Sequence, residues 1–444
     1  MTSKQVVIVG GGVSGLSAGV CLSERGVPVT LLEQKPTLGG RAYSFKDAET
    51  GDIIDNGQHV LIVGYERTMQ FLKTIGTLHL LSIQPLPVLI FHHPQKGFCR
   101  FQLPKLPTPM HFIVGILQSN LFSFMDRWRM LRAGKDIQAA DVEDSLATMT
   151  VEQWLDSVGQ SAECRRSFWE PIAVSMMNEN LATAPALPFV RSLRKAFLGN
   201  WRNACLAVPN VGLSQLYVEG SQKYIDTHGG KISCGADVVE ILFKDSLVER
   251  VRLRNNVEVE CTALILAVPP YRVQALLPDA MLRGPSLSDI QSIRYSPIIS
   301  AHLWFVKDFM DHEFCGLIGR RTQWLFNRRK IIKESGKGGH VSAVISAAYD
   351  FVEYSNEELI RLTLEDIRSV YPALATEPTH AVVIREKRAT FSLTPKTEYL
   401  RPPQETSVPN LFLAGDWTNT GYPATIEGAI VSAERCADLA MRVV

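Results

Sequence analysis

The chain has 444 residues, of which 46% are hydrophobic and 20% charged, and its formal net charge is +1. This composition excludes a disordered protein, and typical domain sizes of ~100–200 residues predict two or three structural units. The balanced charge gives no electrostatic reason to expect nucleic-acid binding. The eight cysteines are scattered, with no C-x-x-C pair and no metal-ligand spacing, which indicates free thiols in a reducing compartment and no metal site.

The stretch 6–33 predicts a βαβ unit. A buried strand at 6–9 leads into the G-x-G-x-x-G motif of Gly10, Gly12 and Gly15, a helix follows at 16–23, and a second strand at 27–32 ends on Glu33. The glycines allow a tight turn, backbone approach to a pyrophosphate, and close helix packing. We therefore expect dinucleotide phosphates at the helix N-terminus and ribose hydroxyls on Glu33.

Two loops follow this unit. The first contains Gly39-Gly40-Arg41, whose amides and guanidinium we expect to return to the same pyrophosphate. The second is Asp55-Asn56-Gly57-Gln58-His59, in which Asn-Gly marks a tight turn. From residue 65 to 210, long segments separated by prolines predict a mostly helical substrate domain, with Thr150 as a helix N-cap.

Strand patterns return after residue 210. We expect strands at 238–242, 248–253 and 257–261, and a buried strand at 263–268 that Pro269 and Pro270 terminate. A mixed segment at 271–394 predicts strands at 298–305 and 341–349 and a helix at 356–370. The last stretch, 410–430, reads as strand, Gly415-Asp416 turn, loop and C-terminal helix, with Asp416 suited to polyol hydroxyls.

Taken together, these motifs resemble the flavin-dependent amine oxidase and phytoene desaturase superfamily. Within it, three stretches are most similar to the hydroxysqualene dehydroxylases, also called squalene-associated FAD-dependent desaturases: 40–59, 203–214 and 414–429. The resemblance implies an α/β fold with a Rossmann-type FAD-binding domain, like that of glutathione reductase and the amine oxidases. The resemblance also implies an inserted substrate domain that combines helices with a mixed sheet. The FAD domain is expected to comprise residues 1–64, 211–270 and 395–444, and the substrate domain residues 65–210 and 271–394.

The resemblance also implies the cofactor and its contacts. FAD is expected without a covalent link, because Cys436 lies too deep in the final helix to attach it. The expected FAD-binding residues are Gly10, Gly12, Val13, Ser14, Gly15, Glu33, Gln34, Gly40, Arg41, Ala42, Gly57, Gln58, Val238, Gly415, Asp416, Thr425 and Ile426.

The implied reaction is the reductive dehydroxylation of hydroxysqualene to squalene in isoprenoid and hopanoid lipid synthesis. It needs a hydride from reduced flavin, a proton for the leaving hydroxyl, and a dry pocket. His59 and Glu427 are the candidate proton donors, and Tyr422 is a further catalytic candidate. The alternatives to these catalytic roles are structural: His59 could bond a backbone carbonyl, and Glu427 could cap a helix.

No second G-x-G-x-x-G follows a strand, so we expect electrons from another protein or a loosely bound reductant. Only residues 1–5 precede the first strand, which leaves no room for a secretory signal, and we expect a cytoplasmic protein. The apolar segment 112–124, with arginines behind it, is a candidate for peripheral membrane contact, with core burial as the alternative. Three other functions remain open: a carotenoid-type desaturase or amine oxidase, a non-catalytic prenyl-lipid-binding protein, and a structural partner in a lipid-synthesis complex.

Overall fold

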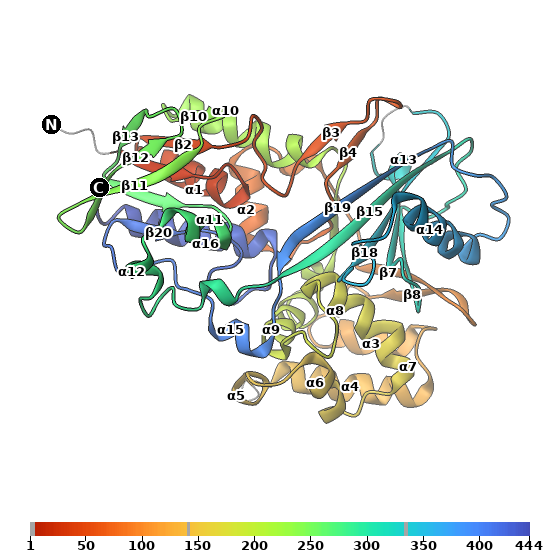
Figure 1. Ribbon diagram of the computed structural model, residues 1–444. Helices are drawn as coiled ribbons and strands as arrows, with labels where there is room; N and C mark the ends of the chain where they lie inside the picture. The colour runs from red at the N-terminus through yellow and green to blue at the C-terminus, as the bar shows by residue number, and fades with distance from the viewer. Residues whose placement is uncertain (1–4, 140–142, 333–335) are drawn as a thin grey trace.

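The structure is a computed structural model, and it describes residues 5–139, 143–332 and 336–444. The chain forms two lobes (Figure 1), one built around a parallel sheet and the other around a larger mixed sheet with a layer of helices. Both lobes are assembled from segments distant in sequence, because the chain crosses between them several times. The predicted α/β class, with an inserted helical and mixed-sheet domain, is confirmed.

Five parallel strands form the sheet of the first lobe, in the order β10-β2-β1-β14-β20. They are β1 (Val6–Val9), β2 (Val29–Glu33), β10 (Lys231–Cys234), β14 (Ala263–Leu266) and β20 (Leu411–Leu413). The apolar runs of β1, β14 and β20 are fully buried, as in a sheet covered on both faces. All five strands lie in segments expected for the nucleotide-binding domain, whose boundaries stay a prediction.

Three helices cover one face of this sheet: α1 (Val13–Glu24), α10 (Gly220–Thr227) and α16 (Ile426–Ala440). An antiparallel ribbon of β11 (Val238–Lys244), β12 (Leu247–Leu253) and β13 (Glu258–Glu260) precedes β14. After β14 the chain enters α11 (Pro270–Leu276) and α12 (Asp279–Leu282). Pro270 is the first residue of α11, where the missing N–H of proline costs no helical hydrogen bond.

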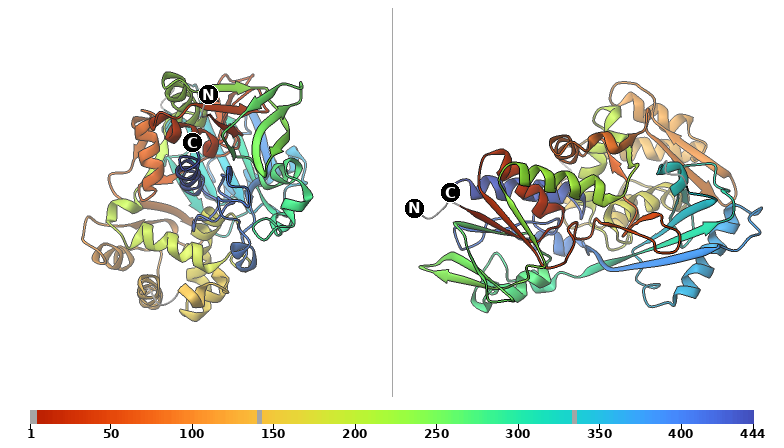
Figure 2. Two further views of the ribbon diagram at one scale, coloured as in Figure 1. Left: turned by 90° about the vertical axis from the view of Figure 1, so that its left-hand side faces the viewer. Right: turned by 90° about the horizontal axis from the view of Figure 1, so that it is seen from above.

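Seven strands form the sheet of the second lobe, in the order β19-β15-β18-β17-β16-β7-β8. They are β7 (Val88–His93), β8 (Gly97–Gln102), β15 (Tyr295–Phe305), β16 (Phe314–Leu317), β17 (Trp324–Asn327), β18 (Gly339–Ser346) and β19 (His380–Phe391). The long strands β15 and β19 run between the lobes (Figures 1 and 2). Helix α14 (Asn356–Val370) packs on this sheet through Leu364 and Ile367.

Among the described residues of 65–210 most of the secondary structure is helical, as predicted, but the segment also contributes the hairpin of β7 and β8. Both strands join the mixed sheet, because β7 pairs in parallel with β16. Each shows only a short alternation of buried and exposed residues, so its sequence signal is weak. The substrate lobe therefore draws its sheet from both predicted substrate segments.

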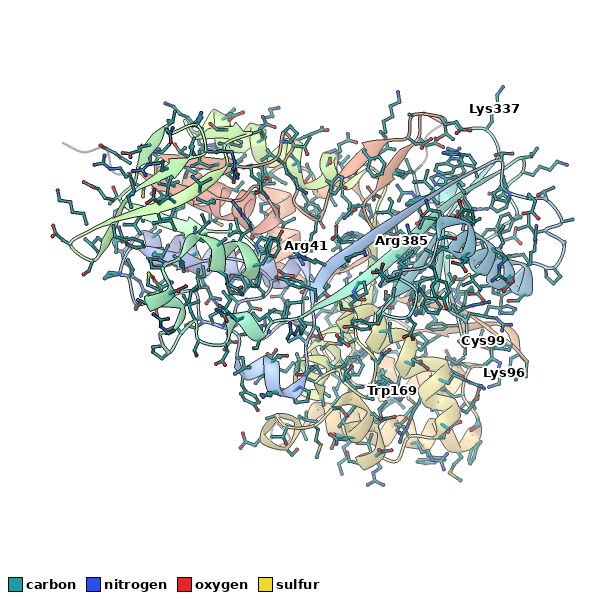
Figure 3. The ribbon with its side chains drawn as sticks, in the orientation of Figure 1. Arg41, Lys96, Cys99, Trp169, Lys337 and Arg385 are labelled. Carbon is teal, nitrogen blue, oxygen red and sulfur yellow. The ribbon has the colours of Figure 1, made fainter. Side chains whose placement is uncertain are left out.

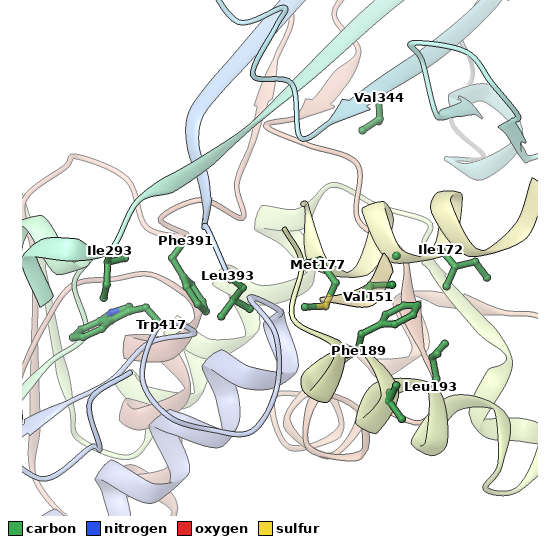
Figure 4. Close-up of a cluster of buried hydrophobic side chains, with 14 of the residues drawn as sticks. Val151, Ile172, Met177, Phe189, Leu193, Ile293, Val344, Phe391, Leu393 and Trp417 are labelled. Carbon is green, nitrogen blue, oxygen red and sulfur yellow. The ribbon is translucent and has the colours of Figure 1, made fainter. Parts of the chain in front are cut away.

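The helical layer beneath the sheet contains α3 (Met110–Gln118), α4 (Phe124–Gln138), α6 (Val151–Ser157), α8 (Glu170–Met177) and α9 (Ala186–Phe197). Thr150 forms a capping box with Gln153 at the start of α6, as its position predicted. Figure 4 shows Ile172, Phe189 and Leu193 converging between α8 and α9. This apolar core fixes the helices that face the mixed sheet.

Smaller elements join the lobes. The strands β3 (Ser44–Lys46) and β4 (Ile53–Asp55) pair with each other, and β5 (Leu61–Ile62), β9 (Leu206–Pro209) and β6 (Leu81–Ile83) form a second small sheet beside α2 (Glu66–Thr74). Short helices are α5 (Glu143–Leu146), α7 (Ala162–Cys164), α13 (Arg328–Ile331) and α15 (Pro395–Tyr399). The remaining helical turns are η1 (Leu78–Leu80), η3 (Arg165–Trp169), η4 (Trp201–Ala204), η5 (Ser214–Glu219) and η6 (Ile290–Ser292). Among the described residues, no helix is long and apolar enough to cross a membrane.

Candidate active site

A cavity of about 580 Å³ runs from the β1–α1 turn to the face of the mixed sheet. Its polar end is lined by residues of the first lobe and of the loops at 39–42 and 57–60. Its other end is apolar and lies between the sheet and the helical layer. The two ends form one continuous space, so a cofactor held in the first lobe faces the apolar end.

The β1–α1 turn is shaped by close backbone packing. Gly10 has a φ of +110°, and a Cβ at Gly15 would lie 1.9 Å from the carbonyl oxygen of Gly10. Helix α1 has no capping side chain and no acidic residue in its first turn, while Val13 and Ser14 line the cavity. Free amides at a helix N-terminus attract phosphate, so this end fits a dinucleotide pyrophosphate.

Glu33 lies at the end of β2 and lines the cavity with Gln34 and Val238. Its two carboxylate oxygens accept hydrogen bonds from the amides of Gly11 at 2.6 Å and Lys35 at 2.8 Å. These bonds fix the carboxylate and leave each oxygen further capacity to accept. Glu33 is therefore oriented as an acceptor for ribose hydroxyls.

The Gly-Gly-Arg loop packs directly on the glycine-rich turn. The Gly39 amide donates to the carbonyl of Gly11 at 2.8 Å, and a Cβ at Gly40 would lie 3.0 Å from the Cα of Gly12. Arg41 lies at the junction of the lobes (Figure 3) and donates to Asp416 Oδ1 at 2.6 Å. It also donates to the carbonyl of Ala389 at 2.8 Å. The sequence did not predict this pairing of Arg41 with the C-terminal motif.

The C-terminal motif closes the same end of the cavity, where Gly415, Asp416, Thr425 and Ile426 all line the wall. Thr425 caps α16 by accepting from the amide of Gly428 at 3.1 Å. A residue missed in the sequence, Arg401, holds this segment: it donates to the carbonyls of Asp416 at 2.9 Å and Tyr422 at 2.7 Å. Its place beside two prolines gave no signal of that role.

The loop at 57–60 presents Gln58 and His59 to the cavity. His59 Nδ1 lies 2.8 Å from the carbonyl of Gly57, which can only accept, so Nδ1 carries the hydrogen. Burial lowers the pKa of His59 below its ordinary value of 6.5. At neutral pH the ring is therefore neutral, and Nε2 is an acceptor rather than a proton donor.

Glu427, a candidate proton donor, is not among the described residues that line the cavity. It is completely buried and accepts from the amides of Arg67 at 3.2 Å and Thr68 at 2.8 Å. The Thr68 hydroxyl donates to the same carboxylate at 2.7 Å. Glu427 thus caps the N-terminus of α2, the structural alternative considered above.

Tyr422 is also absent from the described residues that line the cavity, and its catalytic role stays a prediction. Its hydroxyl accepts a hydrogen bond from Lys195 Nζ, which also lies 4.9 Å from the centroid of its ring. The carbonyl of Tyr422 is held by Arg401. These contacts tie the C-terminal loop to α9.

The apolar end of the cavity is built by both the sheet and the helices. Its wall includes Leu89, Phe101, Leu103, Ile172, Met176, Phe197, Leu206, Phe314, Trp324, Phe326 and Val344. The polar edge of Trp324 is satisfied, because its Nε1 donates to Ser175 Oγ at 2.7 Å. This end is suited to a hydrocarbon. The described residues contain no cluster of three or more potential metal ligands.

Comparison with known proteins gives consistent results. A family model described as flavin containing amine oxidoreductase matches residues 13–441. A hydroxysqualene dehydroxylase of Zymomonas mobilis is 28% identical, with 98% of each chain covered. A 15-cis-phytoene desaturase of Glycine max is 25% identical over 97% of this chain and 78% of its own length. The structure of putrescine oxidase bound to putrescine superposes with a TM-score of 0.72 at 18% identity, covering 98% of both chains.

Proposed function

The chain belongs to the family of flavin-containing amine oxidoreductases, and from this premise we propose that it reductively dehydroxylates hydroxysqualene to squalene. The observation that carries the proposal is the continuity of the cavity, in which the residues suited to a dinucleotide and the apolar wall line one space. The name of the Zymomonas mobilis relative, which matches along its full length, supports this substrate over a carotenoid or an amine.

The cofactor of this family is a flavin, and we propose FAD bound without a covalent link. The α1 amides would hold its pyrophosphate, Glu33 its ribose, and Asp416 the polyol chain. No cysteine lies among the described residues that line the cavity, which supports the absence of a thioether link. When bound and reduced, the flavin supplies a hydride.

The chain's own residues bind and orient the substrate and exclude water. The carbon–oxygen bond breaks, the hydroxyl leaves as water with a proton taken from solvent at the polar end of the cavity, and the allylic carbon left behind has cationic character. Aromatic faces of the apolar wall, including Phe101 and Trp324, are suited to stabilise that charge. In this proposal the neutral ring of His59 positions the substrate rather than acting as the acid.

The function is tested with protein whose flavin has been reduced anaerobically. Addition of hydroxysqualene is expected to reoxidise the flavin and to release one squalene for each flavin. Reoxidation without squalene, or aerobic turnover of phytoene or amines instead, would point to a desaturase or an amine oxidase. A preparation that binds no flavin would favour the prenyl-lipid-binding alternative, and bound flavin without turnover a structural role.

The capping role of Glu427 predicts a specific variant phenotype. Glu427→Gln should reduce the free energy of unfolding by about 1–3 kcal/mol, because a charge-assisted cap becomes a neutral one. Turnover should stay within about twofold of wild type, since the side chain is not part of the cavity wall. Thermal unfolding and single-turnover kinetics measure the two effects, and a large loss of turnover at unchanged stability would restore Glu427 as the acid.

We further propose that the protein takes its substrate from an anionic membrane surface. Five large apolar side chains on α3 and α4 are strongly exposed: Met110, Leu117, Phe124, Met125 and Trp128. Arg132 and Lys135 are exposed on α4 beyond them. Apolar groups flanked by basic ones match an interface with acidic lipids.

The position of this face relative to the cavity supports a lipid occupant. The inner side of α3 packs on the apolar wall, where the rings of Phe112 and Phe197 are 5.8 Å apart. A Cβ at Gly115 would lie 2.6 Å from the Leu103 side chain, and both Leu103 and Phe197 line the cavity. Helix α3 thus lies between the exposed apolar face and the cavity wall, so a hydrocarbon that enters from a bilayer there would cross a single helical layer.

Replacing Phe124 and Trp128 together with serine is expected to weaken binding to vesicles containing phosphatidylserine by about tenfold or more, through loss of aromatic insertion. Vesicle flotation measures the effect, and turnover of detergent-solubilised substrate should not change. Val306→Ser is the control, because Val306 is 65% exposed but lies at the end of β15. Equal binding by the double variant and wild type would contradict the proposal.

A net reduction needs an electron source. We propose that a separate protein or small reductant supplies it. Its identification requires reduction assays with candidate donors under anaerobic conditions.

A further inference from the structure

The loop at 57–60 places two polar side chains of fixed orientation at the cavity. Gln58 and His59 are neighbours in sequence, and both line the cavity. One side chain offers a hydrogen-bond donor and the other an acceptor, and each is oriented by a hydrogen bond to another residue.

Gln58 is oriented by a buried arginine. Arg328 Nη1 contacts the Gln58 side chain, and because a guanidinium has only donors, the contacting atom must be the carbonyl oxygen Oε1. The amide nitrogen of Gln58 therefore lies on the other side. One of its two hydrogens is directed at the carbonyl of His59, 3.3 Å away, and the second is left for a ligand.

Arg328 is in turn held firmly. Its Nη2 lies 3.0 Å from Asp55 Oδ2, and both side chains are 2% exposed. Asp55 Oδ1 accepts from the hydroxyl of Ser44 at 2.7 Å and the amide of Leu213 at 3.0 Å. The amide of Gln58 cannot rotate without placing its NH₂ group against a buried cation, which is strongly unfavourable.

His59 supplies the complementary group. Its Nδ1 hydrogen is donated to the carbonyl of Gly57, so the lone pair on Nε2 is the free ring acceptor. A hydroxyl group is both a donor and an acceptor. It matches this pair, whereas a hydrocarbon matches neither member.

We propose that Gln58 and His59 form a subsite for the hydroxyl group of an allylic alcohol, and that Arg328 is its positioning residue. In place of the FAD contact expected from its sequence, Gln58 donates from Nε2 to the hydroxyl oxygen, and the hydroxyl hydrogen is donated to His59 Nε2. The inference rests on the proposed function, because it assumes an alcohol as the ligand. The subsite fixes the carbon that bears the hydroxyl and leaves the arms to the apolar wall.

The subsite predicts selective binding. A bound hydrocarbon leaves the Gln58 donor and the His59 acceptor unpaired in a buried space, and each loss has a cost in affinity. Each of the two residues forms one hydrogen bond with the alcohol and none with the hydrocarbon. The net free energy of one such bond corresponds to a preference of about 3- to 10-fold for the alcohol.

The test measures the dissociation constants of hydroxysqualene and squalene for the protein with oxidised flavin, in which the alcohol is not reduced. Wild type should prefer the alcohol. Gln58→Glu keeps the contact with Arg328 but replaces the donor by an acceptor, and His59→Phe removes the acceptor. Each variant should lose about 3- to 10-fold of the preference, because the alcohol loses a hydrogen bond and squalene no longer leaves that group unpaired.

Arg328 is tested as a pair of variants. Arg328→Met in an Asp55→Asn background frees the Gln58 amide to rotate and should lower the preference, while Arg328→Lys supplies another donor-only group and should restore most of it. An unchanged preference in the Gln58 and His59 variants would overturn the subsite. Failure of reduced wild type to form squalene would instead overturn the proposed function, because binding is measured separately from turnover.

Discussion

Gly15→Ala is expected to leave a folded protein that has lost most of its affinity for flavin. The new Cβ would lie 1.9 Å from the Gly10 oxygen and 3.1 Å from the Gly10 carbonyl carbon, so α1 must move away from the turn. That movement displaces the amides of Val13 and Ser14, which line the cavity. Overpacking of this kind costs ~1–3 kcal/mol, and at the upper value the dissociation constant for FAD rises about 100-fold.

The measurement is the flavin content of purified protein, followed by titration of the cofactor-free protein with FAD. Gly26→Ala is the matched control: Gly26 has a φ of +73° but nothing within 4 Å of the added Cβ, and it lies in the turn after α1. This control should bind flavin normally with a small loss of stability. Thermal unfolding of both cofactor-free variants separates lost binding from lost folding, and normal flavin content in Gly15→Ala would contradict the expectation.

Local sequence signals predicted the frame of the molecule well. The β1–α1 turn has the predicted strand, glycines and helix, and the helix expected at 356–370 is α14. Both depend on contacts within a few residues: the apolar run of β1, and the capping box of Ser355 and Glu358. Such elements carry their own information, so a single sequence is enough to find them.

The candidate site differs from the expectation in the direction in which side chains point rather than in where the motif lies in the chain. Ile426 and Ala429 line the cavity, and Glu427 lies between them in sequence. On a helix, however, consecutive residues point about 100° apart, so Glu427 faces α2 while its neighbours face the cavity. The motif was found in the right place, but the face of α16 that each residue occupies depends on how the helix packs.

No pattern in the sequence indicated which distant side chains form hydrogen bonds or ion pairs with one another. Arg328 and Gln58 are 270 positions apart, and Arg41 and Asp416 are 375 apart. Arg328 begins a basic run of three residues, yet its side chain is 2% exposed and orients a cavity residue. Nothing local distinguishes such an arginine from an exposed one, because its burial is decided by β4 and the loop at 57–60.

The state of His59 makes the pH dependence of alcohol binding the most discriminating prediction. Its pKa lies below 6.5, chiefly because burial disfavours the charged ring; Arg41 lowers it further, whereas Asp55 and the Gly57 carbonyl raise it. Above pH 6.5 the ring is neutral and Nε2 accepts. As the pH falls through the lowered pKa, Nε2 gains a hydrogen and no longer accepts from the hydroxyl.

The affinity of oxidised protein for hydroxysqualene is therefore expected to be constant above pH 6.5 and to fall only as the pH drops through the lowered pKa of His59, while the affinity for squalene stays flat. Titrations of both ligands in wild type and His59→Phe, in which the pH dependence should vanish, measure this directly. The alternative, His59 as the acid, predicts the opposite sign: tighter alcohol binding and faster single turnover as the ring becomes protonated. Because the two roles need opposite protonation states of one nitrogen, one pH series decides between them.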